Sequence, residues 1–207
     1  MYIFARSLLC LLVLLSQLHT NALAVDIAAN HKKIKFEVES ITLGDEVYEI
    51  PEPWIGNRIP VPEIPQSSFR MIPPLHAHKE AHLYITQDAH SALLELFKAA
   101  QEDGLHLKIE SGYRSPGYQK KIFIRMINEG REFIDIVRYV APPGYSQHAL
   151  GTAVDFYPSN WRFADLAEYK WLQENAADFG FTETYPEKNS LHYPWEAWHW
   201  IYNPEEQ

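Results

Sequence analysis

The chain reads Ser-Gln-His-Ala-Leu-Gly-Thr-Ala-Val-Asp at residues 146–155. The histidine of this stretch, His148, precedes a tight turn that Gly151 predicts. The short apolar run that follows, residues 152–154, predicts a strand, and this strand ends on the carboxylate of Asp155. An imidazole and a carboxylate brought together by a turn and a strand form half of a candidate zinc site.

A second block, Glu-Ala-Trp-His-Trp at residues 196–200, supplies the remaining groups. A catalytic zinc ion needs three protein ligands and one open position for water. His199 is the candidate third ligand beside His148 and Asp155. Glu196 lies three residues earlier and places a further carboxylate near the metal, where it can act as general base. A single histidine among the ten in this chain is more often a core or surface group, but the combined ligand types and spacing favour a metal site.

These motifs also carry a family resemblance. Ser-x-His-x-x-Gly-x-Ala-x-Asp, followed far downstream by Glu-x-Trp-His, resembles the zinc D-alanyl-D-alanine carboxypeptidases of the VanY type, which are grouped with lysostaphin-like peptidases and the hedgehog signalling domain. The resemblance covers roughly Leu83 to Asn203. Three further blocks match in order, namely residues 111–115 with Gln119, residues 141–144 and residues 171–181.

The resemblance implies roles for particular residues. The metal is Zn²⁺, and its ligands are His148, Asp155 and His199. Glu196 is the general base. Arg114 faces the substrate and the tetrahedral intermediate, and a planar guanidinium suits a carboxylate or an oxyanion there. The family positions near the substrate backbone and its terminal carboxylate are occupied by Gln119 and Ser146.

The function that follows from the resemblance is removal of a terminal D-alanine from peptidoglycan stem peptides. Two enzyme alternatives remain open, an L,D-carboxypeptidase and an endopeptidase that acts on cross-links. A different class is a non-catalytic, zinc-containing binding module. A zinc buffer is a further alternative, which would use the histidines at positions 76, 78 and 82.

Composition and the N-terminus indicate where the protein acts. Residues 1–24 combine Arg6, an apolar run and a small-x-small site, which is typical of a cleaved secretory signal. Removal of the signal also removes the only cysteine, Cys10, and leaves 17 of the 18 basic residues against 27 acidic ones, a net charge of −10. We therefore expect an exported bacterial protein, periplasmic or extracellular, without a disulfide or a membrane anchor. Its acidic balance makes nucleic acid an unsuitable partner, and we expect a monomer.

The length of 207 residues suits one main domain. Residues 25–74 are rich in proline and predict an extension that wraps the domain, while residues 75–207 form the catalytic domain. Within the extension, residues 34–39 alternate like a strand and could pair with residues 41–48 through a turn at Gly44-Asp45.

The remaining periodicity predicts an α+β fold in which a small, mainly antiparallel sheet packs with helices, similar to hedgehog and D-Ala-D-Ala peptidases. Helices are expected from Thr86 to Gly104, from Ser115 to Gly130 and from Asp165 to Phe179, with a further helical stretch over residues 131–140. Strands are expected at residues 105–109, 152–154, 181–185 and 198–202.

Overall fold

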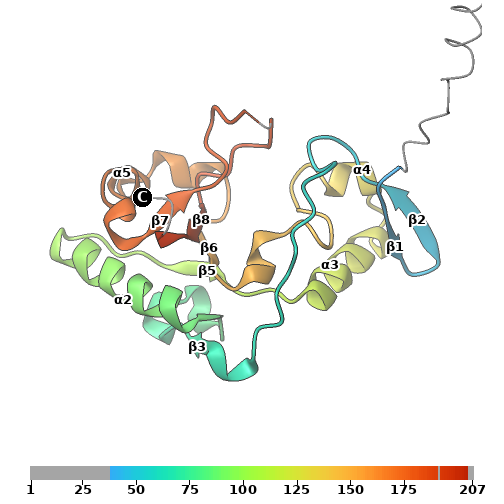
Figure 1. The fold of residues 1–207 in the computed structure, drawn as a ribbon. Helices are drawn as coiled ribbons and strands as arrows, with labels where there is room; N and C mark the ends of the chain where they lie inside the picture. Colours follow the sequence, from blue (N-terminus) through green and yellow to red (C-terminus); the bar gives the residue numbers. More distant parts are fainter. Residues whose placement is uncertain (1–37, 191, 205–207) are drawn as a thin grey trace, which may run out of the picture. The chain divides into compact units, whose positions relative to one another are not determined.

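The sheet that carries the candidate ligands has four strands, and all of its pairs are antiparallel. The computed structural model describes residues 38–190 and 192–204. The strand order is β5 (Ile109–Ser111), β6 (Ala153–Phe156), β8 (His199–Tyr202) and β7 (Phe181–Glu183), as Figure 1 shows. The predicted fold class, a small antiparallel sheet with packed helices, is therefore confirmed.

Strand β6 is central because its sequence can be buried on both faces. All four of its residues are buried, and it pairs with β5 on one side and β8 on the other. Asp155 lies opposite Ser111 of β5 and opposite His199 of β8. The register of the sheet thus brings together two candidate ligands that lie 44 residues apart in the chain.

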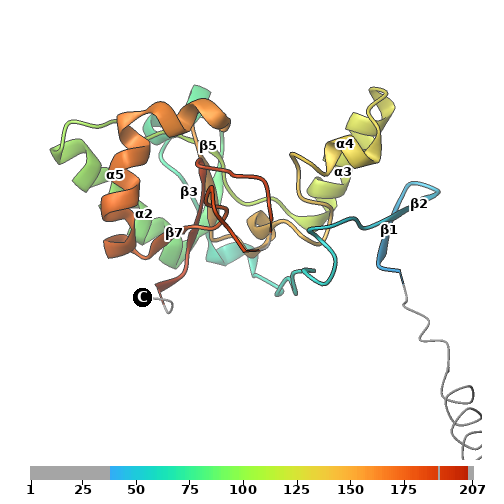
Figure 2. The same ribbon diagram turned by 90° about the horizontal axis from the view of Figure 1, so that it is seen from above.

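Two helices cover one side of this sheet in both views (Figures 1 and 2). Helix α2 (Gln87–Glu102) turns a stripe of buried residues inward, as its spacing predicts. Helix α5 (Ala167–Asn175) continues into a 3-10 turn that ends at Gly180, whose φ of 76° is the left-handed conformation that favours glycine. The largest fully buried side chains of this main core are Phe156, Phe163, Phe181, Ile72, Ile85, Leu93, Leu96, Ile109 and Leu172.

A second hydrophobic cluster forms on the other side of the sheet, around α3 (Pro116–Asn128) and α4 (Phe133–Ile136). The hairpin of β1 (Ser40–Leu43) and β2 (Glu46–Glu49) contributes apolar side chains to this cluster. Trp54 is buried in it and donates a hydrogen bond from Nε1 to the carbonyl of Val137 at 3.1 Å. The proline-rich segment is therefore packed through Trp54 against the α4 region.

The other elements are short. Strands β3 (Phe69–Met71) and β4 (Tyr84–Thr86) form a separate antiparallel pair. The 3-10 helices are η1 (Gln66–Ser68), η2 (Pro74–His76), η3 (His78–Glu80), η4 (Gln147–Leu150), η5 (Trp161–Asp165) and η6 (Ala176–Phe179).

Several predicted elements differ from the observed ones in length. The strand expected at residues 105–109 begins only at Ile109, because β6 ends at Phe156 and pairs with Ile109. The alternation that suggested a longer strand reflects burial, since Leu107 and Ile109 are both buried. The helix expected at residues 165–179 is α-helical only over Ala167–Asn175. The stretch at residues 131–140 contains only the four-residue α4.

At the N-terminus, the predicted turn at Gly44-Asp45 is present, but it joins Ser40–Leu43 to Glu46–Glu49. The predicted pairing of residues 34–39 with residues 41–48 is therefore wrong for the residues that the structure describes. Residues 34–37 lie outside the described residues. The predicted signal, residues 1–24, lies outside them too. Residues from Glu39 onward form one compact unit, and the boundary at residue 75 stays a prediction.

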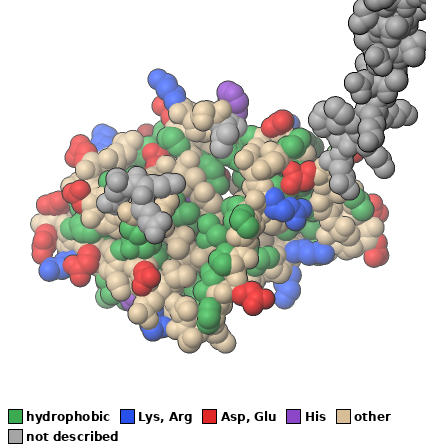
Figure 3. Space-filling view, viewed as in Figure 1, with side chains coloured by type: hydrophobic (Ala, Val, Ile, Leu, Met, Phe, Trp, Pro, Cys, Tyr) green, Lys and Arg blue, Asp and Glu red, His purple; other side chains and the backbone are tan. Residues whose placement is uncertain are grey.

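The surface carries no single dominant charged patch on the face that Figure 3 shows. Acidic and basic side chains are scattered there with hydrophobic ones between them. Within the described part of the chain, no helix has the length and apolar character needed to cross a membrane.

Truncation of Trp54 tests whether the proline-rich segment stabilises the domain. Trp54→Ala removes a buried indole and its hydrogen bond to Val137, so the free energy of unfolding should fall by about 3–5 kcal/mol. Trp161→Ala is the matched control, because Trp161 is 66% exposed and its loss should change stability by less than about 0.5 kcal/mol. Urea unfolding of both variants measures the difference, and equal effects would show that the segment is not part of the folded core.

Candidate metal centre and catalytic cavity

The turn before β6 sets the position of His148. The 3-10 helix η4 ends at Gly151, which has a φ of 73° and donates a backbone hydrogen bond to His148. A Cβ at Gly151 would lie 2.9 Å from side-chain carbons of Phe69 and Thr86. Glycine is required here both by its backbone conformation and by this close packing, as the sequence predicts.

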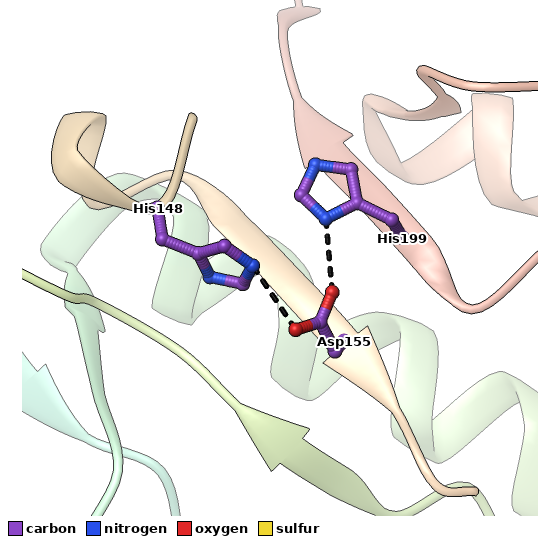
Figure 4. Close-up of side chains that lie close together, drawn as sticks. All are labelled: His148, Asp155 and His199. Carbon is purple, nitrogen blue, oxygen red and sulfur yellow. Dashed lines mark hydrogen bonds and ion pairs between the residues drawn. The ribbon is translucent and has the colours of Figure 1, made fainter. Parts of the chain in front are cut away.

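The carboxylate of Asp155 lies between two imidazoles, as Figure 4 shows. Its Oδ2 is 3.0 Å from His148 Nε2, and its Oδ1 is 2.9 Å from His199 Nδ1. All three side chains are buried, and their ligand atoms lie within 4.8 Å of one another. The structure thus brings together the three residues predicted as metal ligands.

In each imidazole, the ring nitrogen that points away from Asp155, here called the far nitrogen, lies close to an oxygen atom. His148 Nδ1 is 2.7 Å from the carbonyl oxygen of Gly112, and His199 Nε2 is 2.9 Å from the amide oxygen of Gln147. A neutral imidazole carries one N–H. If that proton is on the far nitrogen of each ring, two bare nitrogens face the ionised oxygens of Asp155.

Burial and the interactions within the cluster together decide the charges of His148 and Asp155. Burial lowers the pKa of His148 to about 4, so His148 is neutral at pH 7. Burial alone would raise the pKa of Asp155, but its interactions with His148 and His199 hold that pKa well below the ordinary value. An ionised carboxylate and two imidazoles therefore converge, and the guanidinium of Arg114 lies 3.9 Å from Asp155 Oδ2. This donor set fits a zinc ion, which prefers nitrogen and oxygen ligands in this number.

A cavity of about 190 Å³ opens beside the cluster. Residues from several elements line it, including the three candidate ligands, and both predicted catalytic residues are among them. The lining side chains other than the ligands include Arg114, Glu196, Ser146, Gln147, Tyr185, Trp54, Tyr139 and Trp198.

Glu196 is half-buried at the end of the loop that precedes β8. Its backbone N–H donates to the carbonyl of Tyr185 at 3.0 Å, and its own carbonyl accepts from the N–H of His199 at 2.9 Å. Burial is the main cause that raises the pKa of Glu196 to about 7; the negative charge of Asp155 adds to the rise, while His199 and Arg114 oppose it. A carboxyl group with this pKa can both accept and release a proton near neutral pH.

Arg114 reaches the same cavity from the end of β5. Its backbone N–H donates to the carbonyl of His148 at 3.1 Å, and its guanidinium Nη2 lies 3.9 Å from Asp155 Oδ2. Its Nε is buried and has no hydrogen-bond partner among the described residues. The guanidinium is thus held at the cavity with donor capacity left over.

The two residues predicted near the substrate differ in their surroundings. Ser146 lines the cavity, and its buried hydroxyl has no hydrogen-bond partner in the described part of the chain. Gln119 is also buried, but its Nε2 donates to the carbonyl of Ala141 at 2.7 Å. Gln119 therefore fixes the loop that contains Ala141, itself a lining residue.

The histidines near position 80 are placed differently from the predicted ligands. His76 stacks on Phe97 and His78 stacks on Tyr157, with ring centroids 4.0 and 3.7 Å apart, and His82 is exposed. Over residues 38–190 and 192–204, the cluster of His148, Asp155 and His199 is the only group of three potential ligands.

Several lining residues were not predicted from the sequence, among them Gln147, Tyr185 and Trp54. Gln147 stands inside the quoted motif, next to His148, and this position was a usable signal. Tyr185 stacks on His199 with ring centroids 5.0 Å apart, and Trp54 comes from the proline-rich segment. No periodicity or spacing links either aromatic residue to the motif.

An antiparallel sheet with a buried His-Asp-His cluster, a carboxylate and an arginine beside it is typical of metallopeptidases. The family model of the VanY D-alanyl-D-alanine carboxypeptidases matches residues 82–205. The chain belongs to this family, and the predicted resemblance is confirmed.

Individual relatives agree with the family. YodJ of Bacillus subtilis (strain 168), which is named as a carboxypeptidase, is 31% identical over 170 residues, covering 78% of this chain and 59% of YodJ. A D-alanyl-D-alanine carboxypeptidase of Enterococcus faecalis (strain ATCC 700802 / V583) is 33% identical over 120 residues, covering 53% of this chain and 45% of the relative. The chain spans about half the length of the curated relatives it matches.

A solved structure extends the likeness. The structure of the LD-carboxypeptidase LdcB is similar over 82% of this chain and 86% of LdcB, with a TM-score of 0.63 and 29% identity. The similarity covers a larger share of the chain than residues 82–205.

Within the cavity, the shifted pKa values of His148 and Glu196 act on stability with opposite signs. His148 has a lowered pKa, so between pH 6.5 and about 4 the unfolded chain binds more protons, and the free energy of unfolding falls as the pH falls. Glu196 has a raised pKa, so between about pH 7 and 4.5 the folded protein binds more protons, and the free energy of unfolding rises as the pH falls.

Removal of one of these groups should expose the effect of the other. In metal-free Glu196→Gln, the contribution of Glu196 is lost while that of His148 remains, so the free energy of unfolding should fall by roughly 2 kcal/mol more than in the wild type between pH 6.5 and 4.5. Denaturant unfolding at a series of pH values in the presence of a chelator measures this. Parallel pH profiles for the two proteins would contradict the assignment of the shifted groups.

Proposed function

We propose that this protein is a zinc-dependent carboxypeptidase that removes the terminal D-alanine from peptidoglycan stem peptides. The observation that carries the proposal is the convergence of His148, Asp155 and His199 with Glu196 and Arg114 around one cavity. Membership of the VanY family supports the reaction. A binding module without catalysis would not need a carboxyl group of raised pKa and an arginine beside the ligand cluster.

Zn²⁺ held by His148, Asp155 and His199 would supply a Lewis acid that polarises the scissile carbonyl and lowers the pKa of water. The residues of the chain prepare the site for this ion. His148 is neutral, the far nitrogen of each histidine lies beside an oxygen, and Asp155 stays ionised. Their burial excludes competing solvent from the ligand atoms.

Glu196 moves the proton. Its carboxylate accepts a proton from the attacking water and then gives it to the nitrogen of the leaving D-alanine. The raised pKa, about 7, suits both steps because the group is neither too strong nor too weak an acid at neutral pH. The half-buried position of Glu196 keeps this proton inside the cavity.

Arg114 binds negative charge on the substrate. Its backbone is held by the hydrogen bond to His148, its guanidinium lies near Asp155, and its Nε has no partner among the described residues and can donate. It can bind the terminal carboxylate of the peptide or the oxyanion that develops on the scissile carbonyl. Ser146 also lines the cavity, and its hydroxyl is proposed to bind the substrate backbone. Gln119 is proposed to support substrate binding indirectly, because it holds the loop that contains Ala141.

The bond that is cleaved has two candidates. The name of the Enterococcus faecalis relative supports cleavage of D-alanyl-D-alanine. The likeness to LdcB, an LD-carboxypeptidase, covers more of this chain and supports cleavage of an L,D bond in tetrapeptide stems. Both reactions release one D-alanine, so the same catalytic residues serve either.

The setting of the reaction is part of the proposal. Residues 1–24 direct export, and the mature protein acts as a monomer in the periplasm or outside the cell. Residues 25–74 extend a catalytic domain that begins near residue 75. Cell-wall peptides lie outside the cytoplasm, which agrees with this location.

Glu196→Gln tests the mechanism. The wild type should hold one zinc ion per chain and release D-alanine from defined muropeptides, whereas the variant should keep the zinc and lose at least about 10²-fold in turnover, because the proton acceptor is gone. Mass spectrometry of the products also shows which of the two bonds is cleaved. Loss of D-alanine from pentapeptide stems indicates the D-alanyl-D-alanine bond, and loss from tetrapeptide stems indicates the L,D bond.

His199→Ala is the contrasting variant and should lose both zinc and activity. If Glu196→Gln were as active as the wild type, Glu196 would not be the base. If the wild type left every stem peptide intact, the carboxypeptidase proposal would fall.

Arg114→Lys tests recognition of the substrate. Lysine keeps the charge but lacks the planar fork, so kcat/KM should fall by on the order of 10²-fold, as for loss of one oxyanion donor. Zinc content and unfolding temperature should stay unchanged, because Arg114 is not a ligand. A stem peptide with an amidated C-terminus provides the control: a carboxypeptidase should reject it, and equal cleavage of the acid and the amide would indicate an endopeptidase.

A further inference from the structure

His199 and His148 are held by different kinds of partner. The far nitrogen of His148 faces a backbone carbonyl, that of Gly112, at 2.7 Å. The far nitrogen of His199 faces a side-chain amide, that of Gln147, at 2.9 Å. A backbone carbonyl can only accept, so it fixes the tautomer of His148 whatever the sequence. The tautomer of His199 depends on the residue at position 147.

Gln147 is well placed for this task. It lies on η4 directly before His148, so one short helical turn carries a candidate ligand and the partner of another. Its side chain lines the catalytic cavity, and it also lines a second hollow next to that cavity. The ring of Tyr185 stacks on His199 and restrains the plane of the imidazole.

These contacts determine which ring nitrogen of His199 can bind a metal. With the proton on Nε2 and bound to the oxygen of Gln147, Nδ1 is bare and lies 2.9 Å from Asp155 Oδ1. The bare nitrogen is then on the side where the other two ligand atoms converge. With the proton on Nδ1, the same nitrogen would donate to Asp155 and could not bind a metal.

We propose that Gln147 is a positioning residue whose amide oxygen accepts the Nε2–H of His199 and so makes Nδ1 the metal-binding nitrogen. This inference rests on the zinc site of the proposed function. The partner of the non-ligating nitrogen orients a metal-bound imidazole and raises its basicity, and loss of such a partner costs about 10–100-fold in metal affinity. Gln147 acts through His199 and takes no part in proton transfer.

Substitutions at position 147 can separate acceptance of a hydrogen bond from packing. Gln147→Met has a similar length but no amide oxygen, so zinc affinity should fall by about 10–100-fold. Gln147→Glu keeps an acceptor at the same place, and its zinc affinity should stay close to that of the wild type. Gln101→Met, at an exposed glutamine of α2, is the matched control and should have no effect.

Zinc affinity is measured by competition with a chromophoric chelator, and the unfolding temperature of each metal-free variant checks that it folds. Nitrogen-15 NMR of the zinc-loaded proteins gives a second readout. The Nε2–H signal of His199 should be protected from solvent exchange in the wild type and in Gln147→Glu, and should exchange faster in Gln147→Met. A role in packing alone would not restore affinity and protection in the glutamate variant.

Two results would overturn the inference. One is wild-type zinc affinity in Gln147→Met, and the other is an equal loss in Gln147→Glu and Gln147→Met. If Gln147→Met did not fold, the comparison of Gln147→Glu with Gln147→Ala would decide in the same way. If the wild type bound no zinc, the metal proposal and this inference would both fall. If the wild type bound zinc but Gln147→Met bound it equally tightly, only the inference would fall.

Discussion

The buried carboxylate of Asp155 is the group around which the other parts of the site are arranged. A buried negative charge is costly unless neighbouring groups compensate it. Its two imidazole neighbours come from η4 and β8, and the guanidinium of Arg114 lies 3.9 Å away at the end of β5. Each of these segments is placed by pairing or packing with β6, so the sheet and the site are stabilised by the same contacts.

Much of the site could be predicted because its information is local. Gly151, the short strand after it and Asp155 are consecutive, and each follows from the conformational preference of a few residues. His199 and Glu196 are distant in sequence, yet their ligand chemistry and spacing identified them, and the family motif supported the choice. The structure places all of these residues around one cavity, which local patterns alone could not establish.

The parts that were not predicted depend on contacts between distant segments. Strand β5 is shorter than the alternation of Leu105, Leu107 and Ile109 suggested, because its partner β6 decides where pairing begins. Trp54 and Tyr185 reach the cavity through packing against residues far along the chain, and their own neighbours in sequence carry no sign of it. Composition showed that the proline-rich segment could not form a core alone, but the cluster that it completes was visible only in the fold.

The cavity is lined by residues of both hydrophobic clusters, so its catalytic groups and its opposite wall belong to different parts of the fold. The ligands and Glu196 stand on or beside the sheet of the main core, whereas Trp54 and Val140 belong to the cluster around α3 and α4 and Tyr139 follows α4 in the chain. The register of β6 and β8 fixes the catalytic groups with little tolerance for change. The opposite wall is built from loop residues and one indole, which can vary without disturbing that register. Under the proposed function, selection between stem peptides that differ by one residue is therefore better sought on the α4 side of the cavity, while the chemistry resides on the sheet side.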